Sequence, residues 1–428
     1  MKTIKSIILA AGKGTRMKSE TSKVLHKIFN KELLGYVIDA VNGTGLAEEN
    51  YVIVGHQAES VEDYVTKNYK NVKCRLQSPQ LGTGHAAYQA YEDLKGFKGG
   101  VLILCGDTPL LTDETLKDFI QEHEKSGAAL TVMSAIFEDP TNYGRIIRDE
   151  NGNLKAIIEE KDASPAQKKI KEVNTGVYLI NWDEVSEAFL NLDSNNAQNE
   201  YYLTDIVKWT INKGLKAQSY VLKNNEESYG INSKIHLAQA TKVIKDRVLE
   251  KLMSDGVTIV DPDTTFISPD TEIEPDTIIY PCTYIEGKNK IGKNCKIGPF
   301  SRLRGDVELG DFVKIGNFVE IKKSKIDSHT NVSHLSYIGD STLGNNVNIG
   351  AGTITANYNH ITKEKFETVV ENNASTGSNS VLVAPVRIGE NASIGAGSVV
   401  SKDIEANALG LTRAPLKIFK DWFNKIKK

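Results

Sequence analysis

A glycine-rich segment near the start of the chain, Leu9 to Met17, combines backbone freedom with positive charge. It follows an apolar run, so its glycines let backbone N–H donors approach an anion closely, while Lys13 and Arg16 supply charge for a polyphosphate. The Walker pattern is absent, and the dinucleotide-binding fingerprint fails because Met17 takes the place of its third glycine. The segment predicts a phosphate-binding loop of another kind, with an ordinary loop as the alternative.

Two basic side chains in the other half of the chain have a spacing that could place them in one binding site. Arg304 and Lys322 are 18 residues apart, three times the six-residue period of that half. If three such segments make one turn, the two side chains stack on the same face of neighbouring coils. Two positive charges at that spacing suit a sugar phosphate.

The elements that position the first loop are apolar runs that alternate with amphipathic stretches. We expect helices at Gly35 to Val41 and Asp113 to Glu124. We expect strands at Thr3 to Ala10, Tyr51 to Val54, Val101 to Leu104, Leu130 to Ser134 and Val177 to Ile180. This alternation predicts an α/β domain with a doubly wound, Rossmann-like parallel sheet, whose ligands bind beyond the carboxyl ends of the strands.

After a connecting helix, which Gly256 ends, the apolar period becomes six. Ten aliphatic residues follow at this spacing without a gap: Ile267, Ile273, Ile279, Ile285, Ile291, Ile297, Leu303, Leu309, Ile315 and Ile321. The residue four places later is often small or branched, as at Thr277 and Val313. Six residues per side and three sides per turn predict a parallel β-helix of hexapeptide repeats, which we expect to be left-handed. The gap from Ala356 to Thr368 predicts a loop that leaves the prism.

Length, composition and charge limit the number of domains and the classes of partner that the protein can have. The 428 residues suit two or three domains, and we place them at 1–230, 231–254 (the helix) and 255–428. With 52 Lys+Arg against 55 Asp+Glu, no global basic excess exists to bind nucleic acid or an anionic membrane. Four scattered cysteines without a CxxC pair predict reduced thiols in the cytoplasm. The apolar start is too short for a signal peptide, and no stretch approaches the ~20 apolar residues of a membrane span.

Motifs that occur in a fixed order over essentially the whole chain resemble those of a known enzyme family. The first half contains LAAGKGTRM (9–17), SKVLH (22–26), QLGTGHA (80–86), CGD (105–107), YGR (143–145), EEKD (159–162), NTG (174–176) and NNAQNEYY (195–202). The second contains GPFSRLR (298–304), GNFVEIKK (316–323), SHLSYIGD (333–340), NIGAGT (348–353) and NY (357–358). The chain resembles the bacterial bifunctional N-acetylglucosamine-1-phosphate uridylyltransferase/glucosamine-1-phosphate acetyltransferases. The resemblance implies that acetyl-CoA acetylates glucosamine-1-phosphate and that UTP then converts N-acetylglucosamine-1-phosphate to the UDP-sugar used for cell-wall precursors.

The resemblance implies roles in uridylyl transfer for residues of the first half. Lys13, Arg16 and Lys23 would act on the triphosphate. Mg²⁺ would be held by Asp107 and Asn232, and Asp107 also follows an apolar strand, where an oxygen ligand would meet phosphates. Each of the two could instead cap a turn or helix. Uridine would contact Leu9, Ala10, Ala11, Gly12, Gln77, Gly82 and Thr83, and the sugar would contact Gly144, Glu159 and Asn174. Asn232 would contact substrate as well as the metal.

For acetyl transfer, the resemblance implies that His334 is the general base, a role that suits an imidazole titrating near neutrality. Taken alone, a histidine on a solenoid is more often a hydrogen-bonded surface residue. The family also implies a homotrimer with shared sites. Glucosamine-1-phosphate would contact Arg304, Lys322, Tyr337 and Asn348, and acetyl-CoA would contact Asn357, Tyr358, Ser378, Ala396 and Arg413.

Several departures from the family leave alternatives open. Ser22 replaces the usual proline before Lys23, and the loop after Asn357 is lengthened, so either Lys363 or Lys365 is the coenzyme-side lysine. The prism is shorter by one or two coils before Gly298. Two competing hypotheses remain open. One is a single-activity nucleotidylyltransferase whose β-helix is used for oligomerisation, and the other is a regulatory subunit without catalysis. The end, 417–428, predicts a short amphipathic helix that packs on a neighbour.

Overall fold

The computed structural model describes residues 3–427 and divides into two compact units, Met1–Val243 and Ile244–Lys428. The division falls inside α7 (Lys234–Ser254), which forms where the connecting helix is expected. The limits at 230 and 255 stay predictions, and Met1, Lys2 and Lys428 within them lie outside the described residues. Among residues 3–427, every helix is too short or too polar to cross a membrane.

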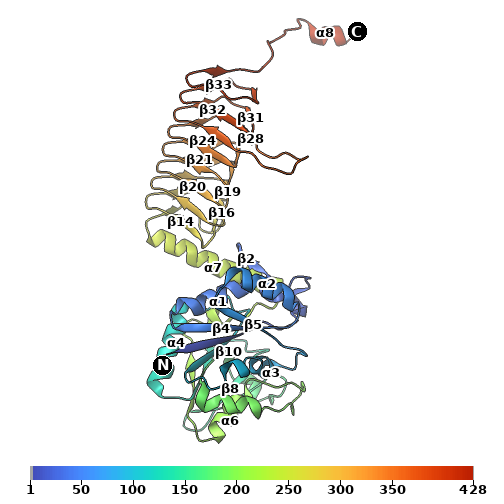
Figure 1. The fold of residues 1–428 in the computed structure, drawn as a ribbon, viewed down its shortest axis with the longest axis vertical. Helices are drawn as coiled ribbons and strands as arrows, with labels where there is room; N and C mark the ends of the chain where they lie inside the picture. Colours follow the sequence, from blue (N-terminus) through green and yellow to red (C-terminus); the bar gives the residue numbers. More distant parts are fainter. Residues whose placement is uncertain (1–2, 428) are drawn as a thin grey trace. The chain divides into compact units, whose positions relative to one another are not determined.

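The first unit contains a nine-stranded sheet (Figure 1). Its hydrogen-bonded order is β11 (Ala217–Val221), β7 (Leu130–Ile136), β10 (Glu172–Asn181), β6 (Gly100–Cys105), β1 (Ile4–Leu9), β4 (Ala47–Val54) and β5 (Val72–Leu76). Off this order, β8 (Arg145–Arg148) pairs with β10, and β9 (Leu154–Ile158) pairs with β8. All five expected strands form. The expectation of an all-parallel sheet is wrong for β10, which is antiparallel to β6 and β7. The hairpin β8–β9 returns the chain without a crossover helix, so the following strand runs antiparallel.

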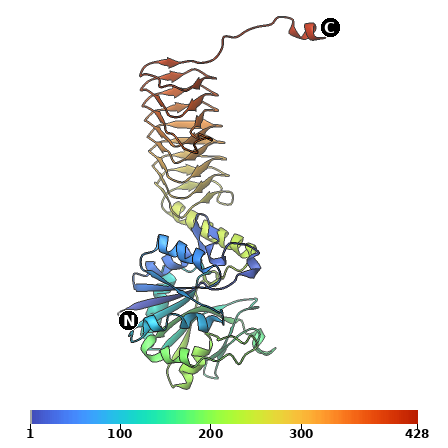
Figure 2. The same ribbon diagram turned by 45° about the vertical axis from the view of Figure 1, so that its right-hand side comes forward.

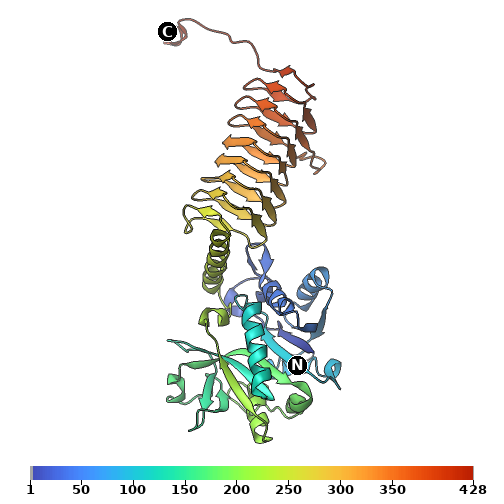
Figure 3. The ribbon, with the colours of Figure 1, turned by 90° about the vertical axis from the view of Figure 1, so that its left-hand side faces the viewer.

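Helices cover both faces of this sheet, as in a doubly wound fold. On one face, α1 (Leu33–Gly43), α2 (Ala58–Asn68) and α4 (Asp113–Ser126) bury apolar side chains in one core. On the other, α3 (Thr83–Tyr88), α5 (Trp182–Val185) and α6 (Asp205–Asn212) bury theirs in a second core. The two predicted helices correspond to α1 and α4, and Figure 3 shows α4 in cyan in front of the strands. A two-residue ribbon, β2 (Lys27–Ile28) and β3 (Lys31–Glu32), precedes α1.

The second unit is a parallel β-helix whose coils each give short strands to three sheets (Figure 2). The first sheet is β12 (Thr258–Ile259), β15 (Ile278–Ile279), β18 (Lys296–Ile297), β21 (Lys314–Asn317), β24 (Asn331–His334), β27 (Asn348–Ile349), β30 (Ser375–Thr376), β33 (Ser393–Ile394) and β35 (Leu409–Gly410). The second is β13 (Phe266–Ile267), β16 (Tyr284–Glu286), β19 (Arg302–Arg304), β22 (Glu320–Lys322), β25 (Tyr337–Gly339), β28 (Ile354–Ala356), β31 (Val381–Val383) and β34 (Val399–Val400). The third is β14 (Thr271–Ile273), β17 (Asn289–Ile291), β20 (Val307–Leu309), β23 (Lys325–Ile326), β26 (Ser341–Leu343), β29 (Thr368–Val370) and β32 (Val386–Ile388).

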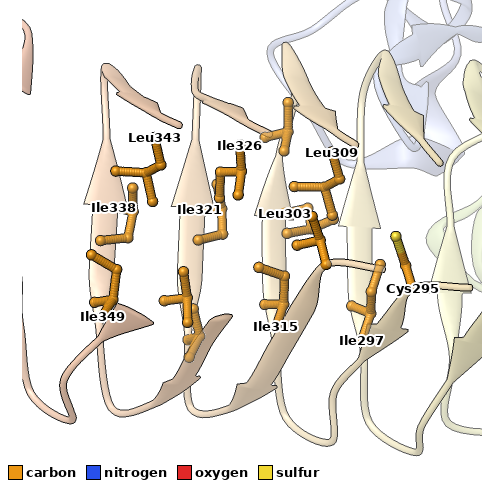
Figure 4. Packing of buried hydrophobic residues seen from close by; sticks show 14 of the residues in the cluster. Cys295, Ile297, Leu303, Leu309, Ile315, Ile321, Ile326, Ile338, Leu343 and Ile349 are labelled. Carbon is orange, nitrogen blue, oxygen red and sulfur yellow. The ribbon is translucent and has the colours of Figure 1, made fainter. Parts of the chain in front are cut away.

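The interior of the β-helix follows the six-residue period of the sequence. All ten aliphatic residues from Ile267 to Ile321 are buried. Figure 4 shows five of them, Ile297, Leu303, Leu309, Ile315 and Ile321, packed inside successive coils. The smaller residues of the second series, such as Thr277 and Val313, are buried as well. Thr277 Oγ1 donates a hydrogen bond of 2.8 Å to Gly292 O, which satisfies its buried hydroxyl. Large and small inward side chains therefore alternate as predicted.

Two segments depart from the prism. Residues 357–367 leave it between β28 and β29 as a hairpin in which Tyr358 pairs with Lys365, which confirms the expected extruded loop (Figure 1). The amphipathic helix expected at 417–428 forms only over α8 (Trp422–Ile426), and Lys428 lies outside the described residues. The tail from Leu411 to Lys427 is exposed, including Phe419 and Trp422.

Candidate active sites

Lys23, Asp107 and Asn232 meet beyond the carboxyl end of β6. The Lys23 ammonium forms an ion pair with Asp107 Oδ2 and donates a hydrogen bond of 3.2 Å to Asn232 Oδ1. Ile231 N donates to Asp107 O at 2.9 Å, which joins the two segments that carry these oxygens. Two hard oxygen donors thus converge on one cation, which is donor chemistry that Mg²⁺ takes. Within residues 3–427 no group of three or more His, Cys, Asp or Glu side chains is arranged around a metal position, so Mg²⁺ here needs further oxygens from phosphate or water.

The glycine-rich loop packs directly on Lys23. Gly14 has a φ of +60°, and a Cβ at this position would lie 2.6 Å from Lys23 Cβ, so a side chain here would displace the lysine. Lys13 and Arg16 are exposed. Arg16 lines a cavity of about 930 Å³ together with Asp107 and Asn232. The loop and the two oxygen donors therefore face the same space.

The residue before Lys23 departs from the family without altering the backbone there. Ser22 has φ −50° and ψ 137°, which a proline also adopts. A proline would therefore fit the backbone that Ser22 adopts before Lys23.

The residues predicted to contact uridine lie where β1 and β5 end. Gln77 follows β5, is buried, and its Nε2 donates to Gly82 O at 2.9 Å. Gly82 has a φ of +108°, and a Cβ there would lie 2.6 Å from Tyr201 O. Thr83 Oγ1 accepts a hydrogen bond of 3.1 Å from Leu203 N. The loop that carries Gly82 and Thr83 is thus held against the segment around Tyr201.

The chain after β1 approaches this loop from the other side. Leu9 ends β1, and Ala10 N donates to Ile53 O at 2.9 Å. A Cβ on Gly55 would lie 2.8 Å from Ala11 Cβ and 2.7 Å from Gln80 Nε2, so the two segments flank Gly55. A Cβ on Gly12 would meet no atom within 4 Å. Gly12 therefore leaves open space beside its backbone, whereas Ala10 and Ala11 are buried.

The three residues predicted for the sugar come together, with Gly144 just before β8, Glu159 just after β9 and Asn174 on β10. Asn174 N donates to Gly144 O at 2.8 Å, and a Cβ on Gly144 would lie 3.5 Å from each carboxylate oxygen of Glu159. Asn174 Nδ2 donates to Tyr178 Oη at 2.8 Å, and Thr204 Oγ1 donates to Glu159 Oε1 at 3.3 Å. Burial, reinforced by nearby carboxylates, raises the pKa of Glu159. The cluster of Gly144, Glu159 and Asn174 can therefore accept hydrogen bonds from hydroxyls and donate hydrogen bonds to them.

In the β-helix, Arg304 and Lys322 lie on adjacent coils, as their spacing predicts. They end β19 and β22, which pair in register at Leu303 and Ile321. Arg304 Nη1 donates to Glu320 Oε1 at 2.8 Å, and this bond raises the pKa of Arg304. The adjacent Lys365 lowers the pKa of Lys322, because two cations share one region. Glu286 also lies 3.6 Å from Arg304, so carboxylates offset part of this positive charge. The region still offers cationic side chains that an anion can contact.

Tyr337 and Asn357 lie beside these cations. Gly339 pairs with Lys322, and a Cβ on Gly339 would overlap Tyr337 Oη and lie 2.9 Å from Asn357 Nδ2. Asn357 Nδ2 also donates to Asp340 Oδ2, which lies 3.9 Å from Lys365 Nζ. Of the two candidate lysines, Lys365 therefore lies at the base of the hairpin, on the Lys322 side.

His334 is exposed at the end of β24, and its ring is oriented by the preceding coil. Its Nδ1 lies 2.8 Å from Asn317 Oδ1, and these residues pair in register on β21 and β24. With the Asn317 amide in this orientation, its oxygen accepts, so Nδ1 carries the proton and Nε2 keeps a lone pair. That tautomer leaves Nε2 available as a proton acceptor.

Three of the predicted coenzyme residues, Ser378, Ala396 and Arg413, lie on the later coils or just after them, apart from Asn357 and Tyr358. Gly397 N donates to Ser378 O at 2.8 Å, and Arg413 Nη1 donates to Ala396 O at 3.0 Å. Tyr358 is exposed on the hairpin. Asn348, predicted for the sugar, lies on β27, in the same sheet as His334 but one coil further on.

The structure adds contacts that the sequence reasoning missed. Tyr178 and Thr204 join the Glu159 group, and Asn317 and Asp340 orient His334 and the hairpin. Asn317 stands 17 residues before His334 at one coil's spacing, so the repeat itself could have indicated it. Tyr178 and Thr204 come from separate elements, and no local spacing indicates their contacts.

Comparisons with known proteins agree with this arrangement. A nucleotidyl transferase family matches residues 5–232, and bacterial transferase hexapeptide repeats match residues 290–323 and 367–402. The chain is 44% identical to the bifunctional protein GlmU of Caldanaerobacter subterraneus, over 97% of this chain and 96% of that protein. The chain belongs to the GlmU family. The GlmU of Syntrophotalea carbinolica is 43% identical over 97% of this chain and 96% of that protein, and that of Pelobacter propionicus is 40% identical over all of both.

As a GlmU, the chain is a bifunctional enzyme with uridylyltransferase and glucosamine-1-phosphate acetyltransferase activities. Full-length similarity to bifunctional relatives favours this conclusion over a single-activity enzyme with a passive β-helix. The alignment with the Pelobacter propionicus protein spans 462 positions against the 428 residues here, so that relative carries residues that this chain lacks.

Proposed function

We propose that the unit Met1–Val243 carries out uridylyl transfer and that the unit Ile244–Lys428 carries out acetyl transfer. In the first unit, Lys13, Arg16 and Lys23 bind the triphosphate of UTP, and Asp107 and Asn232 hold Mg²⁺. The observation that carries this assignment is the convergence of Asp107 Oδ2 and Asn232 Oδ1 on one cation, the Lys23 ammonium. Mg²⁺ bound there supplies neutralisation of triphosphate charge.

Uridylyl transfer then needs positioning rather than covalent chemistry. A phosphate oxygen of N-acetylglucosamine-1-phosphate attacks the α-phosphorus of UTP, and pyrophosphate leaves with the electrons of the broken P–O bond. Gln77, Gly82, Thr83 and the backbone from Leu9 to Gly12 bind uridine. The sugar hydroxyls hydrogen-bond with Glu159, Asn174 and the backbone of Gly144, which the contacts among these residues hold in one place.

For acetyl transfer, the amine of glucosamine-1-phosphate attacks the thioester carbonyl of acetyl-CoA. His334 Nε2 accepts the proton that the amine loses, and coenzyme A leaves as its thiolate. The tautomer set by Asn317 supports this role. Arg304 and Lys322 bind the sugar phosphate, with Tyr337 and Asn348 at the sugar. Asn357, Tyr358, Ser378, Ala396 and Arg413 bind acetyl-CoA.

We propose that the protein assembles as a homotrimer. Phe300, Phe318 and Leu335 form an exposed apolar column on three consecutive coils. These residues are 52%, 55% and 61% exposed, and the two phenylalanine rings stack with their centroids 5.3 Å apart. Exposed apolar surface of this kind favours burial against another chain. Phe318 and Leu335 also directly follow Asn317 and His334 in sequence, so a neighbouring chain packed on this column would lie near the proposed acetyl-transfer site. A cytoplasmic location is supported by the four cysteines, all free thiols.

The test uses the unmodified full-length protein with Mg²⁺ and two separate readouts. With acetyl-CoA, glucosamine-1-phosphate should release free thiol, whereas glucose-1-phosphate, which lacks the amine, should release none. With UTP, N-acetylglucosamine-1-phosphate should release pyrophosphate. If the protein releases pyrophosphate but no thiol, the single-activity hypothesis is correct. The lengthened 357–367 hairpin would then be the first segment to examine as the cause of the lost acetyl transfer.

A further inference from the structure

Lys23 occupies the place where the proposed metal would lie. Its ammonium contacts Asp107 Oδ2 and Asn232 Oδ1, which are the two oxygens assigned to Mg²⁺ under the proposed function, and the inference rests on that assignment. An ammonium and a divalent cation within bonding distance of the same carboxylate oxygen repel each other strongly. The two cations therefore compete for one position.

The surroundings hold this arrangement in place. The side chains of Lys23 and Asp107 are only 16% and 14% exposed, so solvent screens their attraction weakly. Asn232 Nδ2 donates to Gly230 O at 3.3 Å, which leaves its Oδ1 for Lys23. Without a cation, Asp107 would be a nearly buried unpaired carboxylate, which is costly. Lys23 removes that cost in the free enzyme.

A second partner for the same ammonium lies next to it. The stem of Lys23 packs against Gly14 of the glycine-rich loop, where Arg16 faces the same cavity. A polyphosphate bound by that loop offers oxygens to Lys23 in exchange for Asp107 and Asn232. Lys23 can thus change partners without leaving the site.

We propose that Lys23 is a placeholder for the metal, so that divalent cation and nucleoside triphosphate bind together and the cation alone binds weakly. Triphosphate draws the ammonium off Asp107 and Asn232, which frees both oxygens for the metal. Binding of either ligand strengthens binding of the other, because each stabilises the same rearrangement of Lys23. Lys23 is then a positioning residue that links the two binding events, in addition to its contact with phosphate.

The experiment measures Mn²⁺ binding to the full-length protein directly, by electron paramagnetic resonance of free Mn²⁺, with and without UTP and with no sugar phosphate present. In Lys23→Met, Mn²⁺ without UTP should bind about 10- to 100-fold more tightly than in the wild type, the size expected for releasing a hydrogen-bonded charge. The enhancement by UTP should shrink by a similar factor. Lys18→Met is the matched control, because it removes the same charge from an exposed position nearby, and its Mn²⁺ affinity should match the wild type.

Unchanged or weaker Mn²⁺ binding in Lys23→Met would overturn the placeholder. Lys23→Gln, which keeps a polar side chain without charge, must give the same result and replaces the methionine variant if that fails to fold. The double variant Lys23→Met/Asp107→Asn tests the placeholder role of Lys23 separately from the assignment of the metal to Asp107. It should lose the tighter Mn²⁺ binding that Lys23→Met gains. If it binds Mn²⁺ as tightly as Lys23→Met, the metal is not at Asp107, and the metal assignment of the proposed function is wrong.

Discussion

Acetyl transfer should depend on both His334 and the residue that orients it. His334→Ala removes the proton acceptor, and we expect acetyl transfer to fall about 10²–10⁴-fold, the usual contribution of a positioned base. This loss corresponds to about 3–5 kcal/mol of transition-state stabilisation. The Michaelis constant for acetyl-CoA should change little, because the base acts in the transition state.

Asn317→Ala tests the tautomer argument separately. The variant keeps the imidazole but loses the bond of 2.8 Å from Nδ1. A single neutral hydrogen bond contributes about 0.5–1.5 kcal/mol, so we expect only about a 2- to 10-fold loss of rate. Asn317→Asp keeps an oxygen acceptor at this place, and it should retain more activity than Asn317→Ala.

The assay follows thiol release from acetyl-CoA with glucosamine-1-phosphate in excess, and pyrophosphate release from the same preparations serves as the control for folding. Pyrophosphate release should equal that of the wild type in all three variants. The reasoning fails if His334→Ala retains thiol release within about threefold of the wild type, well short of a general base's contribution. It also fails if Asn317→Ala is as inactive as His334→Ala while its uridylyltransferase is intact.

Three further substitutions test other parts of the account. Arg304→Ala should raise the Michaelis constant for glucosamine-1-phosphate about tenfold or more, because it removes a charge-assisted phosphate contact, and an unchanged constant would remove Arg304 from the site. Gly82→Ala should lower the unfolding free energy by about 1–3 kcal/mol in urea denaturation and raise the Michaelis constant for UTP, since φ is +108° and Tyr201 O blocks a Cβ. Phe318→Asp should shift the full-length protein from trimer toward monomer in sedimentation equilibrium, and a trimer of unchanged stability would exclude the Phe300–Phe318–Leu335 column from the interface.

The β-helix could be predicted in detail because its coils repeat the same local rule. Each inward position recurs after six residues, so the buried series from Ile267 to Ile321 and the stacking of Arg304 with Lys322 follow from spacing alone. The Asn317–His334 contact was missed although the repeat could have indicated it. That coil is one residue shorter, so the adjacent side chains are 17 and not 18 residues apart.

In the first unit, local patterns indicated elements but not their direction or their long-range contacts. A central strand buried on both faces has the same apolar pattern whether it runs parallel or antiparallel, so the direction of β10 was mispredicted. Lys23 meets Asp107 across 84 residues and Asn232 across 209, and no periodicity spans such separations. The family resemblance assigned these three residues to one reaction, but only the structure places the ammonium between the two oxygens.

If two independent activities occupy separate units of one chain, Asp107→Ala should affect only one of them. Both thiol release and pyrophosphate release are measured on this variant and on the wild type, with Mg²⁺ present. Pyrophosphate release should be abolished, while thiol release should stay at the wild-type rate. Pyrophosphate release near the wild-type rate, or a parallel loss of thiol release in a folded protein, would contradict it.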